Sequence, residues 1–160
     1  MENETSARVS CTAARPRLEN HRRRRRVLVV DDDQQLLVIL SKLLDRLDFE
    51  VSLACDGREA CDMFRRDYFD LVITDLQMPR MDGLTLMAKI KSRSPKIPVV
   101  VMTGLSPEGV SQSGGVAPAA AVLYKPFDLG MLEQTLAEAL SSGYEPPAET
   151  ARLSDRRQAT

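Results

Sequence analysis

Short apolar runs alternate with amphipathic stretches through the middle of the chain. The first run, residues 27–30, is continuous and has the length of a buried strand. In residues 34–47 the leucines fall on one face at the 3.6-residue period, which predicts a helix with Asp33 as its N-cap. The same alternation predicts further strands at residues 51–54, 71–74, 98–103 and 122–124, and further helices at residues 57–66, 84–92 and 129–140, the last after an Asp128 cap.

This order of elements predicts an α/β fold. Continuous apolar strands that alternate with amphipathic helices are typical of a parallel sheet that helices cover on both faces. The stretch where the fourth helix belongs, residues 106–119, contains three glycines and two prolines. An interior glycine costs a helix about 1 kcal/mol and an interior proline about 3 kcal/mol. We therefore expect only a short helix, at residues 107–113, in a mobile segment.

The charges are unevenly distributed along the 160 residues. The formal net charge of −1 combines +5 in residues 1–26, −6 in residues 27–142 and 0 in residues 143–160. The first of these segments is basic and lacks hydrophobic periodicity, and the last is polar and starts with Gly-Tyr-Glu-Pro-Pro. We expect a disordered basic arm, one folded domain and a disordered tail over these three ranges.

Several classes of protein are disfavoured by the rest of the composition. No apolar run approaches the roughly 18 residues of a membrane span. The N-terminus lacks the apolar stretch of a secretory signal. Cys11, Cys55 and Cys61 show no metal-binding spacing, and their odd number favours reduced thiols in a cytoplasmic protein. We expect Cys55 and Cys61 to be small buried hydrophobic side chains.

Polar side chains stand where the predicted strands end. An open parallel α/β sheet binds its ligands at the carboxyl ends of its strands, so these side chains form a candidate site. They are Asp31, Asp32, Asp75, Thr103 and Lys125.

Carboxylates gathered in this way repel one another, and a divalent cation relieves the repulsion. Mg²⁺ prefers octahedral oxygen coordination, which Asp32, Asp75 and the backbone carbonyl of Gln77 can supply, with Asp31 acting through a water molecule. Asp75 is then also a possible nucleophile, because carboxylates form aspartyl phosphates. Lys125 would neutralise charge on a transferring phosphoryl group, and the Thr103 hydroxyl could donate to it.

Each of these features has a simpler explanation when it is taken alone. Asp31–Asp33 can be a helix cap, Asp75 can be a turn former and Thr103 can belong to a plain turn. Lys125 can be a solvated lysine at a helix entry. Their joint occurrence, in order and at the ends of the right strands, favours the phosphate site.

Four segments resemble the signature regions of the receiver domain of two-component response regulators. They are VLVVDDD at 27–33, DLQMPRMDG at 75–83, VMTG at 101–104 and LYKPF at 123–127. The resemblance covers about residues 27–140. It implies a flavodoxin-like, doubly wound fold with five parallel strands in the order 2-1-3-4-5 and helices on both faces.

The resemblance also implies roles for the candidate site residues. Asp75 would accept a phosphoryl group from the phosphohistidine of a sensor histidine kinase or a phosphotransfer protein. Asp31 and Asp32 would be the acidic pair that holds Mg²⁺. Thr103 would be the switch hydroxyl, and Lys125 would contact the phosphate.

Two departures from the family pattern bear on the output of the domain. Receivers usually carry an aromatic switch residue three positions before the lysine, where this chain has Val122. Tyr124 should share a face of its strand with Val122, so we hypothesise that it partly substitutes. The surface that receivers use for signalling includes the fourth helix, which is weak here.

We therefore expect a single-domain response regulator in the cytoplasm, because no output domain follows residue 140. It would signal to an unknown downstream protein by contact or act in a phosphorelay, and it would be a signalling protein rather than an enzyme with an external substrate. A degenerate receiver that serves only as an interaction module is the alternative.

Two other classes fit the sequence less well. A phosphohydrolase of the haloacid dehalogenase type needs Thr or Val two residues after its second aspartate, where Gln35 stands, and it would leave Asp75 unexplained. The arginine run at 22–26 could bind nucleic acid or an acidic surface. Because the domain is acidic and no aromatic residues interleave with the run, we favour a solvated strand entry and do not expect nucleic acid as a partner.

Overall fold

A computed structural model describes residues 23–141 of the chain. Five parallel strands form one sheet in the order β2-β1-β3-β4-β5, as the resemblance implied. The strands are β1 (Arg25–Val30), β2 (Phe49–Ala54), β3 (Leu71–Asp75), β4 (Val99–Thr103) and β5 (Ala121–Tyr124). The helices are α1 (Gln34–Arg46), α2 (Gly57–Arg66), α3 (Gly83–Arg93), α4 (Pro107–Gln112) and α5 (Leu129–Ser141).

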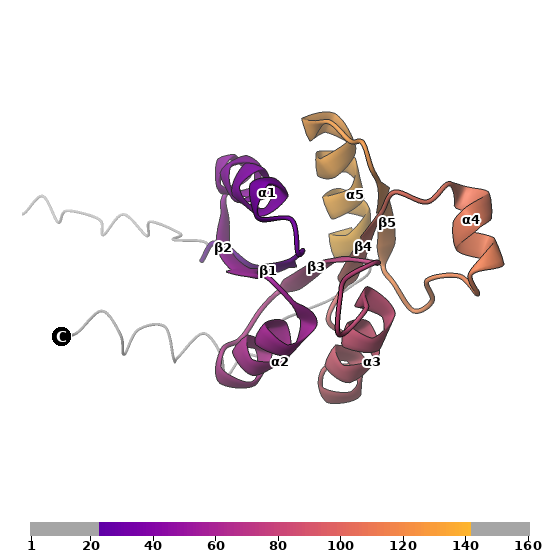
Figure 1. Cartoon of the computed structure of the whole chain (residues 1–160). Helices are drawn as coiled ribbons and strands as arrows, with labels where there is room; N and C mark the ends of the chain where they lie inside the picture. The colour runs from indigo at the N-terminus through magenta and orange to yellow at the C-terminus, as the bar shows by residue number, and fades with distance from the viewer. Residues whose placement is uncertain (1–22, 142–160) are drawn as a thin grey trace, which may run out of the picture.

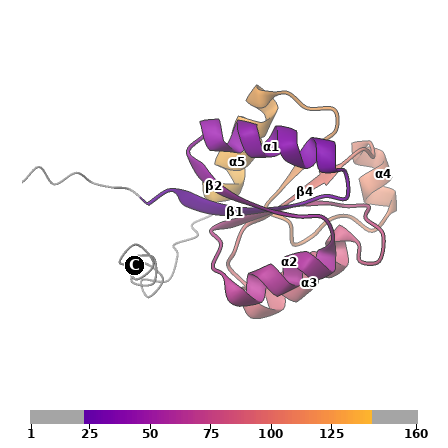
Figure 2. The same ribbon diagram turned by 60° about the vertical axis from the view of Figure 1, so that its left-hand side comes forward.

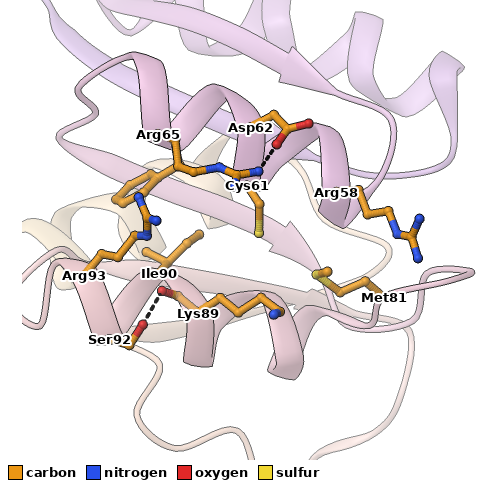
Figure 3. Close-up of a pocket in the computed structure, with 10 residues that line it drawn as sticks. Arg58, Cys61, Asp62, Arg65, Met81, Lys89, Ile90, Ser92 and Arg93 are labelled. Carbon is orange, nitrogen blue, oxygen red and sulfur yellow. Dashed lines mark hydrogen bonds and ion pairs between the residues drawn. The ribbon is translucent and has the colours of Figure 1, made fainter.

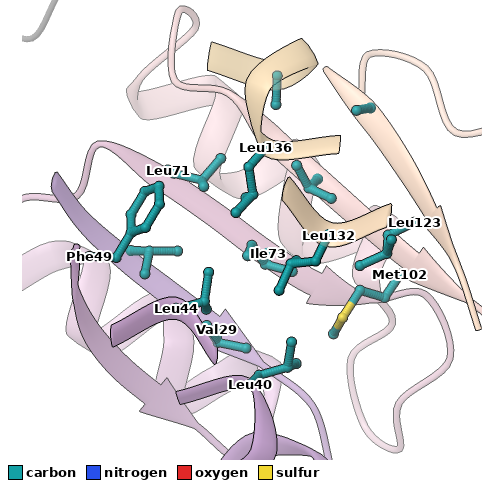
Figure 4. Packing of buried hydrophobic residues seen from close by; sticks show 14 of the residues in the cluster. Val29, Leu40, Leu44, Phe49, Leu71, Ile73, Met102, Leu123, Leu132 and Leu136 are labelled. Atoms are coloured by element: carbon teal, nitrogen blue, oxygen red, sulfur yellow. The ribbon is translucent and has the colours of Figure 1, made fainter. Parts of the chain in front are cut away.

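Helices cover both faces of the sheet, which confirms the predicted doubly wound α/β fold. Helices α1 and α5 lie on one face, and α2 and α3 lie on the other (Figures 1 and 2). Neighbouring residues of β1 alternate between two hydrophobic clusters: Val27 and Val29 face α1 and α5, whereas Leu28 and Val30 face α2 and α3. Figure 4 shows the first cluster, with Leu40 and Leu44 of α1 near Leu132 and Leu136 of α5.

The fourth helix is short, as its composition predicts. It spans six residues, and the Ser106 hydroxyl caps it by accepting from the Gly109 amide. Gly114 and Gly115 follow with φ of 93° and 77°, a left-handed conformation that favours glycine. Figure 1 shows α4 standing out beyond β5 at the edge of the sheet. The mobility of this segment stays a prediction.

The first strand begins two residues earlier than the hydrophobic pattern indicated. Arg25 and Arg26 pair with Phe49 and Glu50 of β2, so these two arginines belong to the sheet and not to the expected arm. The reason is a set of polar contacts far away in sequence, above all those of the buried Asp70 carboxylate. Residues 1–22 and 142–160, which hold the rest of the expected arm and tail, lie outside the described residues.

The cysteines differ from expectation. Cys55 is exposed rather than buried, because it lies in the loop after β2, and Cys61 is only partly buried on α2. Both are free thiols, and Cys11 lies outside the described residues. Across residues 23–141, no helix has the length and apolar character to cross a membrane.

Candidate functional site

Two buried carboxylates and one lysine meet at the carboxyl edge of the sheet. Asp31 follows β1 and is 1% exposed, and Asp75 ends β3 and is 6% exposed. The Lys125 ammonium, just after β5, donates to Asp31 Oδ2 at 3.0 Å and to Asp75 Oδ1 at 2.7 Å. The structure therefore joins three of the predicted site residues, 50 and 94 positions apart in sequence, into one ion-paired cluster.

Backbone amides hold the remaining carboxylate oxygens of this cluster. The Asp33 amide donates to Asp31 Oδ1 at 2.8 Å, and the Gln77 amide donates to Asp75 Oδ2 at 3.0 Å. Asp33 itself accepts from the first amides of α1 and is confirmed as an N-cap. Each buried carboxylate thus has one oxygen on the lysine and one on the backbone, which fixes its orientation.

Glycine is required where α3 begins. The Gly83 amide donates to the Leu76 carbonyl at 3.0 Å and closes the loop that follows Asp75. A Cβ atom at Gly83 would lie 2.2 Å from the Asp75 backbone oxygen, far inside van der Waals contact. Gly83 is therefore a packing position as well as the first residue of α3. Its packing role depends on the approach of α3 to β3, which no local pattern reports.

A clasp ties the loop after β3 to the loop after β2. Arg80, with a left-handed φ of 68°, pairs with Asp56 Oδ2 at 2.6 Å. Beside it, Met81 packs so closely on Gly57 that a Cβ there would lie 2.9 Å from the methionine side chain. Hydrogen bonds from the Glu59 and Arg58 amides, together with Arg80, lower the pKa of Asp56. Sequence reasoning missed this clasp, although an aspartate before a glycine-led helix is a recognisable N-cap signal.

Thr103 lies at the end of β4, buried and close in register to the end of β5. Its hydroxyl oxygen accepts from the Leu105 amide at 3.1 Å, and its carbonyl accepts from the Lys125 amide at 2.7 Å. Within the described residues, no hydrogen bond joins its side chain to Asp75 or to Lys125. The hydroxyl proton is free to be donated to a ligand.

Burial dominates the electrostatics of Asp75. It raises the pKa of the Asp75 carboxyl above its ordinary value, and the hydrogen bond and charge of Lys125 offset this only in part. Burial alone would lower the pKa of Lys125, but its bonds to the two carboxylates outweigh that effect and raise it. The site therefore holds a protonated lysine beside an aspartate whose negative charge is costly.

The donor chemistry suits a hard cation. Asp31 and Asp75 offer carboxylate oxygens at the same edge, and Mg²⁺ commonly takes only one or two carboxylates together with carbonyls and waters. Asp32 lies exposed next to Asp31, and the exposed Gln77 follows the loop. Within residues 23–141, however, no group of three or more His, Cys, Asp or Glu side chains forms a metal cage. Asp31 and Asp75 thus converge on Lys125 with Asp32 exposed beside Asp31, and the metal-binding roles of Asp31, Asp32, Asp75 and the Gln77 carbonyl stay a prediction.

Tyr124 and Val122 share one face of β5, as predicted. Both are half-buried, and they alternate with the buried Ala121 and Leu123. Tyr124 is the register partner of Thr103, whereas Val122 is the partner of Val101. The only aromatic residue of the strand therefore lies directly beside the Thr103 position.

The sequence is similar to known signalling proteins. Residues 27–137 match the model of the response regulator receiver domain family. The transcriptional regulatory protein ZraR of Escherichia coli K12 is 39% identical over 112 residues, which are 70% of this chain and 25% of ZraR. The response regulator protein PilR of Pseudomonas aeruginosa is 33% identical over 118 residues, 74% of this chain and 26% of PilR. The chain spans about a quarter of the length of these curated relatives.

Known structures share the fold over nearly their whole length. The chemotaxis protein CheY4 of Vibrio cholerae has a TM-score of 0.66 at 34% identity, covering 72% of this chain and 98% of CheY4. The receiver domain of a histidine kinase from Syntrophus aciditrophicus has a TM-score of 0.68 at 28% identity, covering 78% of this chain and 96% of the Syntrophus domain. A third structure is the receiver domain of the sensor histidine kinase PA1611 from Pseudomonas aeruginosa, described with magnesium in its active-site cleft. It has a TM-score of 0.66 and covers 73% of this chain and 98% of the PA1611 domain. At 22% identity, this match shows the fold alone. The chain belongs to the response regulator receiver domain family of two-component signalling.

Proposed function

We propose that this receiver accepts a phosphoryl group on Asp75 and signals through the protein contacts that change as a result. The observation that carries the proposal is the Lys125 ammonium, which touches both Asp75 and Asp31 at a strand-end site. A buried carboxylate with a fixed cation beside it suits the transfer of an anionic group, because the cation neutralises incoming charge.

The proposed reaction is a direct displacement at phosphorus. A carboxylate oxygen of Asp75 forms a bond to the phosphorus atom while the bond between phosphorus and the donor nitrogen breaks. The donor nitrogen, on the phosphohistidine of a sensor kinase or phosphotransfer protein, leaves with the bonding electron pair and then gains a proton. The Gln77 amide and Lys125 already hold Asp75 in one orientation, so little side-chain freedom is lost on reaching the transition state.

The acidic edge of the site would hold Mg²⁺ during this step. Asp31, Asp32, Asp75 and the Gln77 carbonyl are the candidate oxygen donors, and water would complete the shell. When bound, the ion would supply positive charge against the oxygens of the transferring group. Asp31 and Lys125 already form the polar wall of this region, and Asp75 carries a raised pKa that a nearby cation would lower.

Thr103 and Tyr124 are the candidate relay to the surface. A phosphoryl group adds about −1.5 to −2 charges and three strong acceptor oxygens. The Thr103 hydroxyl has a proton to donate to such a group, and a shift of Thr103 would change the packing beside its register partner Tyr124. The short α4 lies just beyond this loop, so its surface would change with the state of Asp75.

The partners that fit this function are a sensor histidine kinase or phosphotransfer protein upstream and a contacted protein downstream. The free thiols Cys55 and Cys61 support a reducing compartment, the cytoplasm. Since the curated relatives are much longer than this chain, the activity of their other regions carries nothing over to this one.

Intact-protein mass spectrometry tests the proposal. The full chain is incubated with Mg²⁺ and a small phosphoramidate donor, which avoids the need for the cognate kinase. We expect one added phosphoryl group that depends on Mg²⁺ and is absent from Asp75→Asn. Asp45→Asn, which changes an exposed carboxylate on α1, should keep the adduct. A folded protein that binds Mg²⁺ but forms no adduct with phosphoramidate or acetyl phosphate would favour a degenerate interaction module instead.

A further inference from the structure

A groove between α2 and α3 has no part in the chemistry proposed above. It lies on the face of the sheet opposite α1 and α5, and its cavity volume is about 450 Å³ (Figure 3). Cys61, Phe64, Met81 and Ile90 form the apolar part of its lining, which we call the floor. Ile90 is buried at 1% exposure, and Phe64 stacks on Phe69 with 6.1 Å between ring centroids. The floor is therefore anchored in the hydrophobic core.

Basic side chains line both sides of this groove. Arg58 and Arg65 come from α2, and Lys89 and Arg93 come from α3. Asp62 is the single acid in the lining, and it pairs with Arg65. Within residues 23–141, Arg58, Lys89 and Arg93 form no ion pair. Three cations beside an apolar floor are thus available to an incoming ligand.

This local charge opposes the charge of the domain around it. Residues 27–142 carry a net charge of −6, yet four of their 11 basic residues line this one groove. Basic residues are thus concentrated at this groove on an otherwise acidic domain. The charge selects for an acidic ligand, because complementary potential raises association rates and rejects cationic partners.

The spacing of the cations fits a helix better than a compact anion. Arg58 and Arg65 are seven residues apart on α2, about 10 Å along the axis, and Lys89 and Arg93 are one turn apart on α3. Two rows of positive charge flank a central apolar strip. A helix with an apolar stripe bordered by acidic residues presents the complementary pattern to a groove of this kind.

We propose that the α2–α3 groove is a docking site for an acidic amphipathic helix of a partner protein. The apolar stripe of that helix would pack on Phe64 and Met81, and its carboxylates would pair with Arg58, Lys89 and Arg93. None of Asp31, Asp75 and Lys125 lines the groove. Docking therefore needs no phosphoryl group, and the proposal stands apart from the function of Asp75.

A designed peptide tests the docking site. The probe is a fluorescein-labelled helical peptide with leucines three and four residues apart and glutamates on both flanks, and its twin carries lysines in place of the glutamates. Fluorescence anisotropy with the full chain should show binding of the acidic peptide and not of its twin. The double variant Arg58→Glu/Lys89→Glu should weaken binding at least about tenfold, which corresponds to about 1.4 kcal/mol.

The matched control is Arg66→Glu/Lys96→Glu, which makes the same charge change at two exposed residues outside the groove. An equal loss in this control would overturn the proposal, because it would mean attraction by net charge alone. Asp75→Asn should bind as the wild type does, which separates this test from that of phosphorylation. Amide chemical-shift changes on peptide addition should centre on Cys61, Phe64 and Met81. Changes confined to Arg22–Arg26 would assign the binding to the arginine run and contradict the docking site.

Discussion

At the scale of single residues, the site is a balance between burial and one cation. Asp31 and Asp75 are nearly inaccessible, and two buried carboxylates side by side are tolerated because Lys125 lies between them. The balance is incomplete at Asp75, whose pKa remains raised. A proton or a cation that neutralises the Asp75 carboxylate therefore stabilises the site.

The rate of phosphorylation should follow the ionisation of Asp75. Only the carboxylate is nucleophilic, so at constant Mg²⁺ the initial rate of adduct formation should fall as the pH drops through the pKa of Asp75, which burial raises and a bound cation would lower. Rates measured by intact mass across the acidic range check this. In Lys125→Ala the midpoint should move to higher pH, because a cation that lowers the pKa of Asp75 has been removed. The exposed control Lys96→Ala should leave the midpoint unchanged, and an equal movement in both variants would speak against the cluster as its cause.

The same raised pKa predicts an effect on stability. The folded chain binds the Asp75 proton more tightly than the unfolded chain does, so stability from this group is present below the unfolded pKa and is lost as pH rises through the folded pKa. At neutral pH, Asp75→Asn should therefore be more stable to urea than the wild type. The difference should shrink when both proteins are compared at acidic pH. A less stable Asp75→Asn at neutral pH would mean that the pair with Lys125 outweighs burial.

At the scale of elements, the loop after β3 is held by backbone packing. Gly83→Ala would drive a methyl group into the Asp75 carbonyl, so β3 and α3 must separate. We expect a loss of about 1–3 kcal/mol in the free energy of unfolding, the usual range for overpacking. Gly104→Ala is the matched control, because nothing lies within 4 Å of its Cβ position, and it should be neutral or slightly stabilising. Urea unfolding of both variants measures the contrast, and similar stabilities would refute the packing role of Gly83.

The entry of β1 depends on one buried acid. Asp70 accepts from the Arg23 guanidinium at 2.8 Å and from the Arg26 amide at 2.7 Å. Asp70→Ala should cost about 1–3 kcal/mol, because it leaves the part-buried Arg26 amide without its acceptor. Glu50→Ala, which removes an exposed partner of Arg26, should cost less than about 1 kcal/mol. Chemical denaturation gives the free energy of unfolding of both variants. An equal loss in the two would show that Asp70 acts only as a surface charge.

The predicted elements show what local pattern can and cannot supply. Continuous apolar runs, 3.6-residue periodicity and the positions of glycine and proline are local properties of the chain. The first two predict the strands and the longer helices, and the third predicts the shortness of α4. The start of β1 at Arg25 does not, because it rests on Asp70, 45 positions away. The exposure of Cys55 and the clasp between Arg80 and Asp56 depend likewise on where distant loops meet. The position of the site at the strand ends could be predicted from the sequence. The difference in burial between Asp31, which is buried, and its neighbour Asp32, which is exposed, could not.

At the scale of the whole molecule, one sheet carries two distinct surfaces. Its carboxyl edge gathers Asp31, Asp75 and Lys125, and the face covered by α2 and α3 carries the basic groove. Met81 belongs to the loop that follows Asp75 and also lines the groove. The clasp of Arg80 with Asp56 fixes that loop against α2, so the two surfaces share a structural support.

The location of the phosphoryl group tests the central claim most directly. The full chain is treated with phosphoramidate and Mg²⁺, reduced with borohydride to convert any acyl phosphate to an alcohol, digested and sequenced by tandem mass spectrometry. The account predicts that residue 75 alone carries the reduction mark, and only in protein exposed to the donor. A mark on another carboxylate, such as Asp31 or Asp32, or none in folded protein that has gained a phosphoryl group, would contradict it.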